Sequence, residues 1–441
     1  MIVKTITGQY MSTPFNTHES KHYPVVVIGA GQAGMSMSYC LLQKGINHLV
    51  IERNKCVGRP WDEERWDTFC LVTPNWQCQL PGHHYSGNDP DGFMLKNEIV
   101  DYLNEYNEKY NFPIMFGTQV TLLEKHDDTF FLETNSKQTI TADQVVFACG
   151  TYHKPNILPF HKGINKDVVQ IHSRDYKNPN SLPEGEVLVI GTGQSGCQIA
   201  EDLHLANREV HLCVGPAPRV NRRYRGKDVV SWLEQMGYYK TTIDNHPDGA
   251  RAPFSTNHYV TGRDGGRDLN LRVFAEQGMT LYGMLNDIKD NTLYLKQDLK
   301  EHLDYADNAA KRIRESIESY IQENNIQAPV DSNRHSDYTP EYESEISIED
   351  NAITSVVWAT GFKPAFDWVN LPIFSEKGNP MHKRGISPVD GAYFLGLNWM
   401  HTWGSGRFYQ VGKDADYLSE TILNKAKKLT TAKQHAETLE F

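Results

Sequence analysis

The sequence of 441 residues has no closely spaced cysteines, no long apolar run and no excess of basic residues. No two of its seven cysteines stand two or four residues apart, which excludes a redox dithiol motif and the usual zinc-ligand spacing. No run approaches the roughly 18 apolar residues of a membrane-spanning helix. Its 44 Lys and Arg against 55 Asp and Glu exclude nucleic acid as the main partner. We therefore expect a cytoplasmic protein without a metal site that acts on small molecules.

The sequence does contain an internal repeat. Residues 25–50 read VVVIGAGQAGMSMSYCLLQKGINHLV, and residues 187–212 read VLVIGTGQSGCQIAEDLHLANREVHL, at a constant offset of 162 residues. Each copy begins with a short β-branched run, typical of a strand that is buried on both faces. A Gly-x-Gly-x-x-Gly turn, a helical stretch and a second apolar run follow. This order predicts two strand–turn–helix–strand units that each bind a dinucleotide.

The three glycines of each turn are expected to have separate roles. The first permits the tight turn, the second lets a pyrophosphate approach the backbone, and the third lets the helix pack on the strand. The helices then open with Gln32 in the first copy and with Gln194 and Ser195 in the second, where backbone amides are expected to bind phosphate. In order, the glycines are Gly29, Gly31 and Gly34 in the first copy and Gly191, Gly193 and Gly196 in the second.

The residue at the end of the second strand of each unit indicates which nucleotide fits. Glu52, with Arg53 beside it, offers a carboxylate to a ribose 2′-hydroxyl, which suits FAD or NAD. The equivalent residue of the second copy is Val214, and an arginine cluster follows it that suits a 2′-phosphate. We therefore predict FAD in the first unit and NADPH in the second; a solvated loop is the alternative for the cluster. Its members are Arg219, Arg222 and Arg223.

The sequence resembles the class B flavin-containing monooxygenases over roughly residues 24–215 and 345–415. Besides the two Gly-rich turns, the likeness rests on segments 56–61 (CVGRPW), 147–150 (FACG), 172–176 (HSRDY) and 358–362 (WATGF). The resemblance implies FAD and NADPH as cofactors. The residues that it adds to the cofactor-binding set are Trp61, Val120 and Gly361.

Two motifs of that family are incomplete. Lys166 and Val168 stand where the monooxygenase fingerprint has Phe and Gly, and Val72 stands where the flavin-lining segment has Asn. The candidate catalytic residues lie near the missing Asn and in a C-terminal loop that follows the last predicted strand, where ligands of such sheets bind. They are Thr73, Asn75, Arg407 and Tyr409, with His401 and Trp403 as further pocket candidates.

The repeat predicts an α/β protein with two Rossmann-type domains, in which the NADP-binding domain is inserted into a discontinuous FAD-binding domain. The inserted part carries long loops and an amphipathic helix at about residues 299–324. The apolar stripe of this helix either packs on the protein's own surface or forms a homodimer or partner surface. The predicted ranges are 1–22 for a disordered extension, 23–180 and 346–441 for the FAD-binding domain, and 181–345 for the NADP-binding domain.

The resemblance implies an NADPH-dependent monooxygenase. In that family reduced flavin reacts with O₂ to form a C4a-peroxide, which inserts one oxygen atom into a small organic substrate, and N- or S-oxygenation is favoured here. Baeyer–Villiger insertion and an NADPH reductase or diaphorase without oxygen transfer are the alternatives. A non-catalytic nucleotide sensor is a third class, against which two intact Gly-rich turns argue.

Overall fold

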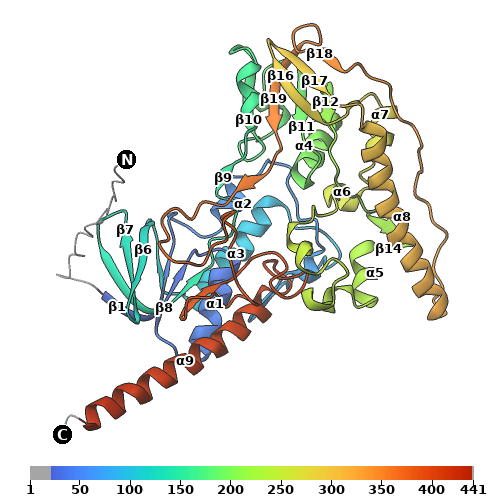
Figure 1. Ribbon diagram of the computed structural model, residues 1–441. Helices are drawn as coiled ribbons and strands as arrows, with labels where there is room; N and C mark the ends of the chain where they lie inside the picture. The colour runs from blue at the N-terminus through green and yellow to red at the C-terminus, as the bar shows by residue number, and fades with distance from the viewer. Residues whose placement is uncertain (1–20, 440–441) are drawn as a thin grey trace, which may run out of the picture.

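The computed structural model describes residues 21–439, so most of the predicted disordered extension (1–22) lies outside the described residues. The first sheet has seven strands within this range (Figure 1). Its first strand begins at Lys21, two residues before the predicted domain. In spatial order the strands are β5 (Ile114–Met115), β2 (His48–Ile51), β1 (Lys21–Ile28), β8 (Thr139–Phe147), β7 (Thr129–Thr134) and β6 (Val120–His126), with β21 (Ala392–Phe394) also paired to β8.

The second sheet is fully parallel and has five strands among the described residues. Helix α4 (Gln194–Leu205) connects its strands β11 and β12, as α1 (Gln32–Gln43) connects β1 and β2 in the first sheet. In order, the strands are β10 (Val169–His172), β19 (Ile353–Trp358), β11 (Glu186–Ile190), β12 (Val210–Cys213) and β15 (Thr280–Tyr282). The predicted α/β architecture with two dinucleotide-binding units is confirmed.

The two repeats have the same register. Val25 pairs with His48 in the first sheet, and Val187 pairs with Val210 in the second. The second half of β1 (residues 25–28) and all of β11 after Glu186 are buried on both faces, as expected for strands inside a covered sheet. The repeat in the sequence is therefore a repeat in three dimensions.

The predicted domain boundaries at 180/181 and 345/346 are wrong for two strands. They assign β10 and β19 to the FAD-binding domain, but both are hydrogen-bonded in the second sheet. A strand as buried as β19 needs a partner along each edge, and β10 and β11 supply the two partners. The second sheet therefore draws its strands from residues 169–358.

The chain passes between the two sheets twice, and the two connections are joined to each other. β9 (Lys154–Pro155) follows the first sheet and pairs antiparallel with β20 (Phe362–Lys363), which follows β19. The backbone amide of Asn156 also donates to the carbonyl of Gly361 over 2.9 Å. The connections thus form a short two-stranded ribbon.

The segment between β12 and β18 adds helices and a small sheet to the second unit. The apolar stripe of α8 is buried at Leu299, Leu303 and Ala306 near one end and at Ile317 near the other, against residues of the same chain. Packing on the protein's own surface is therefore confirmed for this stripe. The added elements are α5 (Val229–Gln235), α7 (Leu271–Glu276), α8 (Leu299–Glu323), β16 (Leu285–Lys289), β17 (Thr292–Leu295) and β18 (Glu345–Ser347).

Short elements complete the chain. The longest helices beside those named are α3 (Lys96–Tyr110) and α9 (Val411–Leu439), and α9 packs along α1 (Figure 1). None of the helices within residues 21–439 is both long and apolar enough to cross a membrane. The short helices and hairpins are α2 (Arg59–Asp62), α6 (Arg263–Gly266), η1 (Asn75–Gln77), η2 (Pro159–Gly163), η3 (Pro179–Ser181), η4 (Tyr238–Lys240), η5 (Ile243–Asn245), η6 (Gly249–Phe254), β3 (Gln79–Leu80), β4 (His83–His84), β13 (Arg223–Tyr224) and β14 (Lys227–Asp228).

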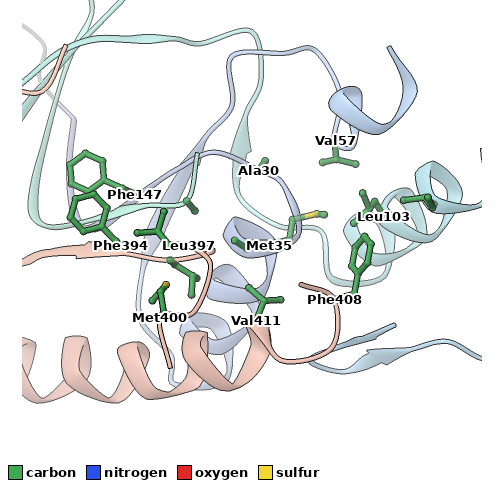
Figure 2. Packing of buried hydrophobic residues seen from close by; sticks show 14 of the residues in the cluster. Ala30, Met35, Val57, Leu103, Phe147, Phe394, Leu397, Met400, Phe408 and Val411 are labelled. Carbon is green, nitrogen blue, oxygen red and sulfur yellow. The ribbon is translucent and has the colours of Figure 1, made fainter. Parts of the chain in front are cut away.

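The main apolar core anchors the C-terminal loop that carries the candidate residues. Phe147 of β8 stacks on Phe394 of β21 with ring centroids 5.1 Å apart. The core continues past Met35 of α1 to Phe408 and Val411, as Figure 2 shows. Because both ends of the loop 395–411 are buried, Arg407 and Tyr409 are held in place by the packing of their neighbours.

Candidate active site

The glycines of both turns have the geometry that the sequence predicts. Gly29 and Gly191 each have φ of +105°. A Cβ at Gly29 would lie 2.8 Å from the carbonyl oxygen of Ala148, and a Cβ at Gly191 would lie 2.8 Å from that of Ala359. A Cβ at Gly34 would overlap the carbonyl oxygen of Gly29, which brings the helix against the turn. A Cβ at Gly31 or Gly193 would meet nothing within 4 Å. The second glycine of each turn therefore faces open space.

The helices that follow these turns present free positive ends to that space. Neither α1 nor α4 has a side-chain cap at its N-terminus, and the first helical backbone bonds are those of Met35 to Gly31 and of Cys197 to Gly193. The amides of the first turn and the helix dipole are thus directed toward an incoming anion. Open space beside each helix end fits a phosphate in both units.

The two units differ where their second strands end. The Glu52 side chain is buried, accepts from the amide of Ala30 at 2.8 Å and also accepts from the amide of Asn54. In the second unit Val214 provides no carboxylate, and the hydroxyl of Thr192 instead bridges the turn to Gly215 at 2.9 Å. A carboxylate beside the turn suits a ribose hydroxyl, whereas its absence suits a phosphorylated ribose.

The three arginines of the predicted cluster lie in different environments. Arg222 is fully buried and forms a two-armed ion pair with Asp228, so its assignment to a 2′-phosphate is wrong in this structure. Its guanidinium is needed to neutralise a buried carboxylate. Arg223 is exposed and donates to the carbonyl of Gly265. Of the three, Arg219 lines a cavity with a volume of about 390 Å³.

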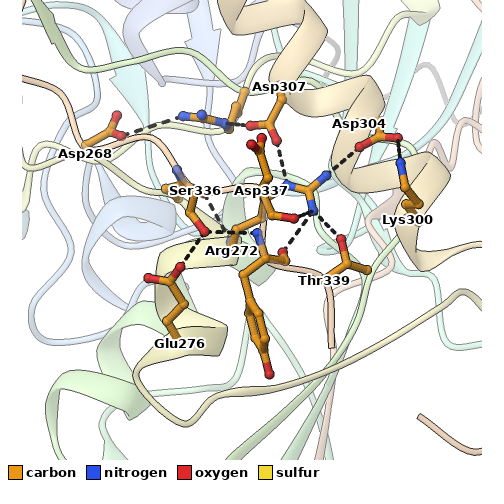
Figure 3. A network of polar contacts seen from close by, with 12 residues as sticks. Asp268, Arg272, Glu276, Lys300, Asp304, Asp307, Ser336, Asp337 and Thr339 are labelled. Carbon is orange, nitrogen blue, oxygen red and sulfur yellow. Dashed lines mark hydrogen bonds and ion pairs between the residues drawn. The ribbon is translucent and has the colours of Figure 1, made fainter. Parts of the chain in front are cut away.

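Arg219 belongs to a network of ion pairs between the end of β12 and helix α8. Its Nε lies 2.6 Å from Asp307, while its buried Nη1 has no hydrogen-bond partner and lies 3.6 Å from Asp268. Arg272 holds the same Asp307 and also Asp304, as Figure 3 shows. Arg219 is therefore neutralised by two carboxylates, and its Nη1 atom without a hydrogen-bond partner is itself buried.

The segment 72–77, which is predicted to line the flavin and is called the flavin-lining segment below, is arranged differently from the prediction. The Asn75 side chain donates to the carbonyl of Asp89 at 2.9 Å and accepts from the amide of Met94 at 2.7 Å, so it holds two loops together. Thr73 is half-buried. Gln77 is 1% exposed, and neither its Nε2 nor its Oε1 has a partner. A buried amide without partners is costly, so Gln77 is the residue of this segment with donors and an acceptor to offer a ligand. Sequence reasoning missed it, because only the fold reveals that its amide lacks partners.

Aromatic rings connect α2 to the C-terminal loop. Trp61 stacks on Phe408 with ring centroids 5.6 Å apart. The guanidinium of Arg65 lies 5.3 Å from the Trp61 ring and 5.4 Å from the Phe69 ring. Sequence reasoning did not select Arg65, because nothing in its spacing distinguishes it from a surface arginine.

The C-terminal loop is covered by the inserted segment. Tyr409 donates from its hydroxyl to Glu234 of α5 at 2.8 Å, and burial raises the pKa of Tyr409. Tyr239 packs on Trp403 with centroids 4.7 Å apart, and Arg407 lies over the same Trp403 at 4.0 Å. The inserted segment and the loop therefore build one aromatic surface together.

The remaining predicted cofactor residues lie in the two turns, after β2, at the start of β6 and between β19 and β20. Gln32 donates to the carbonyl of Gly406 at 3.2 Å, and Gln194 donates to the carbonyl of Val260. Ser195 is half-buried, Val120 is buried at the start of β6, and Arg53 is exposed. Gly361 has φ of +78°, and its carbonyl oxygen lies 2.9 Å from Nε2 of His172.

Asp202 links three segments where the two units meet. It accepts from Thr68 near the flavin-lining segment at 2.6 Å, from Tyr176 at 2.7 Å, and from Arg263 of the inserted segment. Its neighbour Glu201 is 1% exposed, and burial raises the pKa of Glu201 to about 7. His172 and Tyr176, the two fingerprint residues that this sequence keeps, thus form hydrogen bonds at the junction of the two units.

Comparisons with known proteins agree with this architecture. The pyridine nucleotide-disulphide oxidoreductase family matches residues 26–236. An uncharacterized CzcO-like oxidoreductase of Geobacillus kaustophilus is 33% identical over 405 residues, covering 91% of this chain and 98% of that protein. A flavin-containing monooxygenase from Stenotrophomonas maltophilia has a TM-score of 0.63 at 17% identity, covering 92% of this chain and 99% of its own. The OTEMO complex with FAD and NADP has a TM-score of 0.56 at 16% identity, covering 93% and 86%.

The sequence relatives identify an oxidoreductase, and its fold with paired Gly-rich turns is similar to that of the flavin-containing monooxygenase from Stenotrophomonas maltophilia. The resemblance that the motifs predicted is confirmed at this level. The chain belongs to the family of CzcO-like oxidoreductases.

Proposed function

We propose that this protein is an NADPH-dependent flavin monooxygenase that transfers one atom of O₂ to a nitrogen or sulfur atom of a small organic substrate. The observation that carries the proposal is a pair of Gly-rich turns with the same geometry but with different residues at the end of the second strand of each unit. Glu52 beside the first turn suits the unphosphorylated ribose of FAD. The second turn has Val214 there and Arg219 beyond it, which suits NADPH.

The residues present fit both nucleotides. Gly31 and Glu52 would hold FAD, and Gly193 and Arg219 would hold NADPH, because open space and free helix ends lie at both second glycines. Bound FAD would accept hydride from NADPH and supply the electrons that reduce O₂.

The aromatic surface between the inserted segment and the C-terminal loop would keep water from the reacting groups. Trp76, Trp403 and Tyr409 join Tyr239 in one apolar cluster, so this side of the site is lined by rings. Exclusion of water favours oxygen transfer over release of hydrogen peroxide. Gln77 would orient a polar group within the same region through its two unpartnered amide atoms.

Val72 favours a second candidate function, that of a reductase which passes electrons onward without transferring oxygen. The family has an asparagine at this position, whereas Val72 packs in the apolar cluster and its carbonyl accepts from Arg222. A valine side chain offers no hydrogen bond to an oxygen adduct.

Turnover under isotopically labelled O₂ tests the proposal. We expect a sulfide or amine substrate to gain one labelled oxygen atom, with NADPH oxidised in equal amount. If all NADPH electrons are released as hydrogen peroxide with every sulfide, amine and ketone tested, the reductase function replaces the proposal.

A pair of neighbouring glutamines tests the role of Gln77. Gln77→Ala should raise the fraction of NADPH electrons released as hydrogen peroxide severalfold, and Thr73→Ala should act in the same direction. Gln79→Ala is the matched control, because Gln79 already donates to the carbonyl of Trp76 at 2.8 Å. Equal peroxide fractions in the Gln77 and Gln79 variants would remove Gln77 from the site.

A further inference from the structure

The cavity of about 390 Å³ that Arg219 lines brings together segments that are far apart in the sequence. Arg219 belongs to the loop after β12, and Arg272 belongs to α7. Lys311 and Arg314 line the same cavity from helix α8, and part of the segment 325–344, which follows α8, lines it as well. Helix α8 lies outside the strand–turn–helix unit that binds the dinucleotide, but it shares this cavity with the unit.

The loop after β12 connects the cavity to the second Gly-rich turn. The amide of Gly215, where the loop begins, donates to the hydroxyl of Thr192 in the turn at 2.9 Å. Arg219 pairs along the backbone with Tyr259, and the carbonyl of the next residue accepts from Gln194, the first residue of α4. In folds of this type the adenosine ribose of the dinucleotide lies where the second strand ends. The cavity therefore lies on the ribose side of the site.

The two arginines that line the cavity from the loop and from α7 are neutralised by the chain. Arg219 lies 2.6 Å from Asp307 and 3.6 Å from Asp268. Arg272 pairs with the same Asp307 at 2.7 Å and with Asp304 at 2.6 Å, as Figure 3 shows. Their positive charge is therefore balanced within the protein.

The two cations on α8 lack such partners. Within residues 21–439, Arg314 has no carboxylate at ion-pair distance, and its Nη1 donates to the neutral side-chain oxygen of Asn221. Lys311 lies 3.9 Å from Glu315, and because both of these side chains are exposed the pair is weak. The lining carboxylate that remains to oppose them is Asp337, which is exposed on the segment 325–344. Two cations face one carboxylate, so the cavity keeps a surplus of positive charge.

We propose that Lys311 and Arg314 of helix α8 bind the 2′-phosphate of NADPH and thereby determine the preference of the enzyme for NADPH over NADH. This inference rests on the proposed function for NADPH as the electron donor. A guanidinium and an ammonium both bind phosphate, and the phosphate would neutralise the surplus charge of the cavity. NADH has a neutral hydroxyl at the same position and gains no such contact. Arg219 lines the phosphate site, while α8 supplies its unpaired charge.

Calorimetric titration of the FAD-bound enzyme with NADP⁺ and with NAD⁺ tests the proposal. We expect the wild type to bind NADP⁺ about tenfold to hundredfold more tightly than NAD⁺, the range of a charge-assisted hydrogen bond. Arg314→Met should lower this preference about tenfold, and Arg314→Lys should keep part of it. Lys311→Met should lower it about threefold, because the Lys311 side chain is more exposed. The Kd for NAD⁺ should stay the same in all three variants.

Two controls accompany the titrations. Arg312→Met is the matched control, because Arg312 is on the same helix and has the same charge but does not line the cavity. Titration with 2′,5′-ADP and with 5′-AMP repeats the comparison on the adenosine half alone, so the nicotinamide end of the ligand cannot cause the difference.

The inference is overturned if the wild type binds NADP⁺ no more tightly than NAD⁺, or if the double variant with methionine at both positions keeps the full wild-type preference. It is also overturned if Arg312→Met lowers the preference as much as Arg314→Met does. The labelled-oxygen experiment judges the proposed function separately. If the wild type releases only hydrogen peroxide while the preference falls in the variants, the proposed function fails and the phosphate site stands.

Discussion

Arg222 and Arg223 are adjacent in sequence and differ completely in environment. Arg222 is 0% exposed, pairs with Asp228, and lies 4.3 Å from the ring centre of Phe93. It also donates to the carbonyl of Val72, which ties the inserted segment to the flavin-lining segment. Arg223 contacts one backbone carbonyl and is open to solvent. At the scale of one residue, the partner decides whether a charge stabilises the fold or is available to a ligand.

Substitution of each arginine measures this difference. Arg222→Met should lower the free energy of unfolding by about 3–5 kcal/mol, because it leaves Asp228 as an unpaired buried charge. Arg223→Ala should change it by less than about 0.5 kcal/mol, as expected for an exposed side chain. Urea unfolding of both variants gives the two values. Equal and small losses would mean that the Arg222–Asp228 pair contributes no stability.

The sequence allowed the glycine turns and Glu52 to be predicted, because backbone geometry within a few residues imposes those residue types. Arg222 and Asn75 could not be placed in the same way. Their partners include the carbonyl of Val72 and the amide of Met94, which come from segments whose position depends on the whole fold. The residue boundaries of the second unit were predicted wrongly for a similar reason, because the pairing of β10 with β19 joins strands far apart in the chain.

At the scale of an element, each strand–turn–helix unit combines one glycine that faces open space with two that are packed. Gly34 and Gly196 hold their helices against the preceding turn, so their substitution would disturb the fold. Gly31 and Gly193 have room for a methyl group in the protein, so their substitution would disturb only what enters that space. The turns therefore allow folding and cofactor binding to be separated by experiment.

Alanine at each glycine makes that separation. Gly31→Ala should fold normally and lose bound FAD, because its methyl group would occupy the space of a phosphate. Gly193→Ala should keep FAD and lose reduction by NADPH. Gly34→Ala should be unstable, because its Cβ would overlap the carbonyl of Gly29. Circular dichroism, flavin absorbance and anaerobic reduction report the three properties, and loss of FAD from Gly193→Ala would contradict the assignment of the two turns.

At the scale of the whole molecule, buried carboxylates stand at the junction of the two units. Glu201 has a raised pKa of about 7 because burial disfavours its charge, and Thr261, Arg267 and Arg263 only partly offset this effect. The folded state thus keeps the Glu201 proton at pH values where the unfolded chain has lost it. Stability from this group is present below its ordinary pKa of 4.5 and declines as the pH rises to about 7.

Glu201→Gln should remove this dependence on pH. The difference in unfolding free energy, variant minus wild type, should rise by about 2–3 kcal/mol as the pH increases from about 4.5 to about 7.5, in line with the size of the pKa shift. Urea unfolding of both proteins across this range gives the difference. A difference that stays constant with pH would mean that Glu201 is ionised throughout.

The pairing of β9 with β20 has a mechanical consequence. A single connecting strand would let one unit swivel freely about its backbone bonds, but a hydrogen-bonded pair resists torsion and stretching and bends most easily across its flat face. Two hydrogen-bonded connections therefore resist rotation of one sheet relative to the other more than a single connecting strand would.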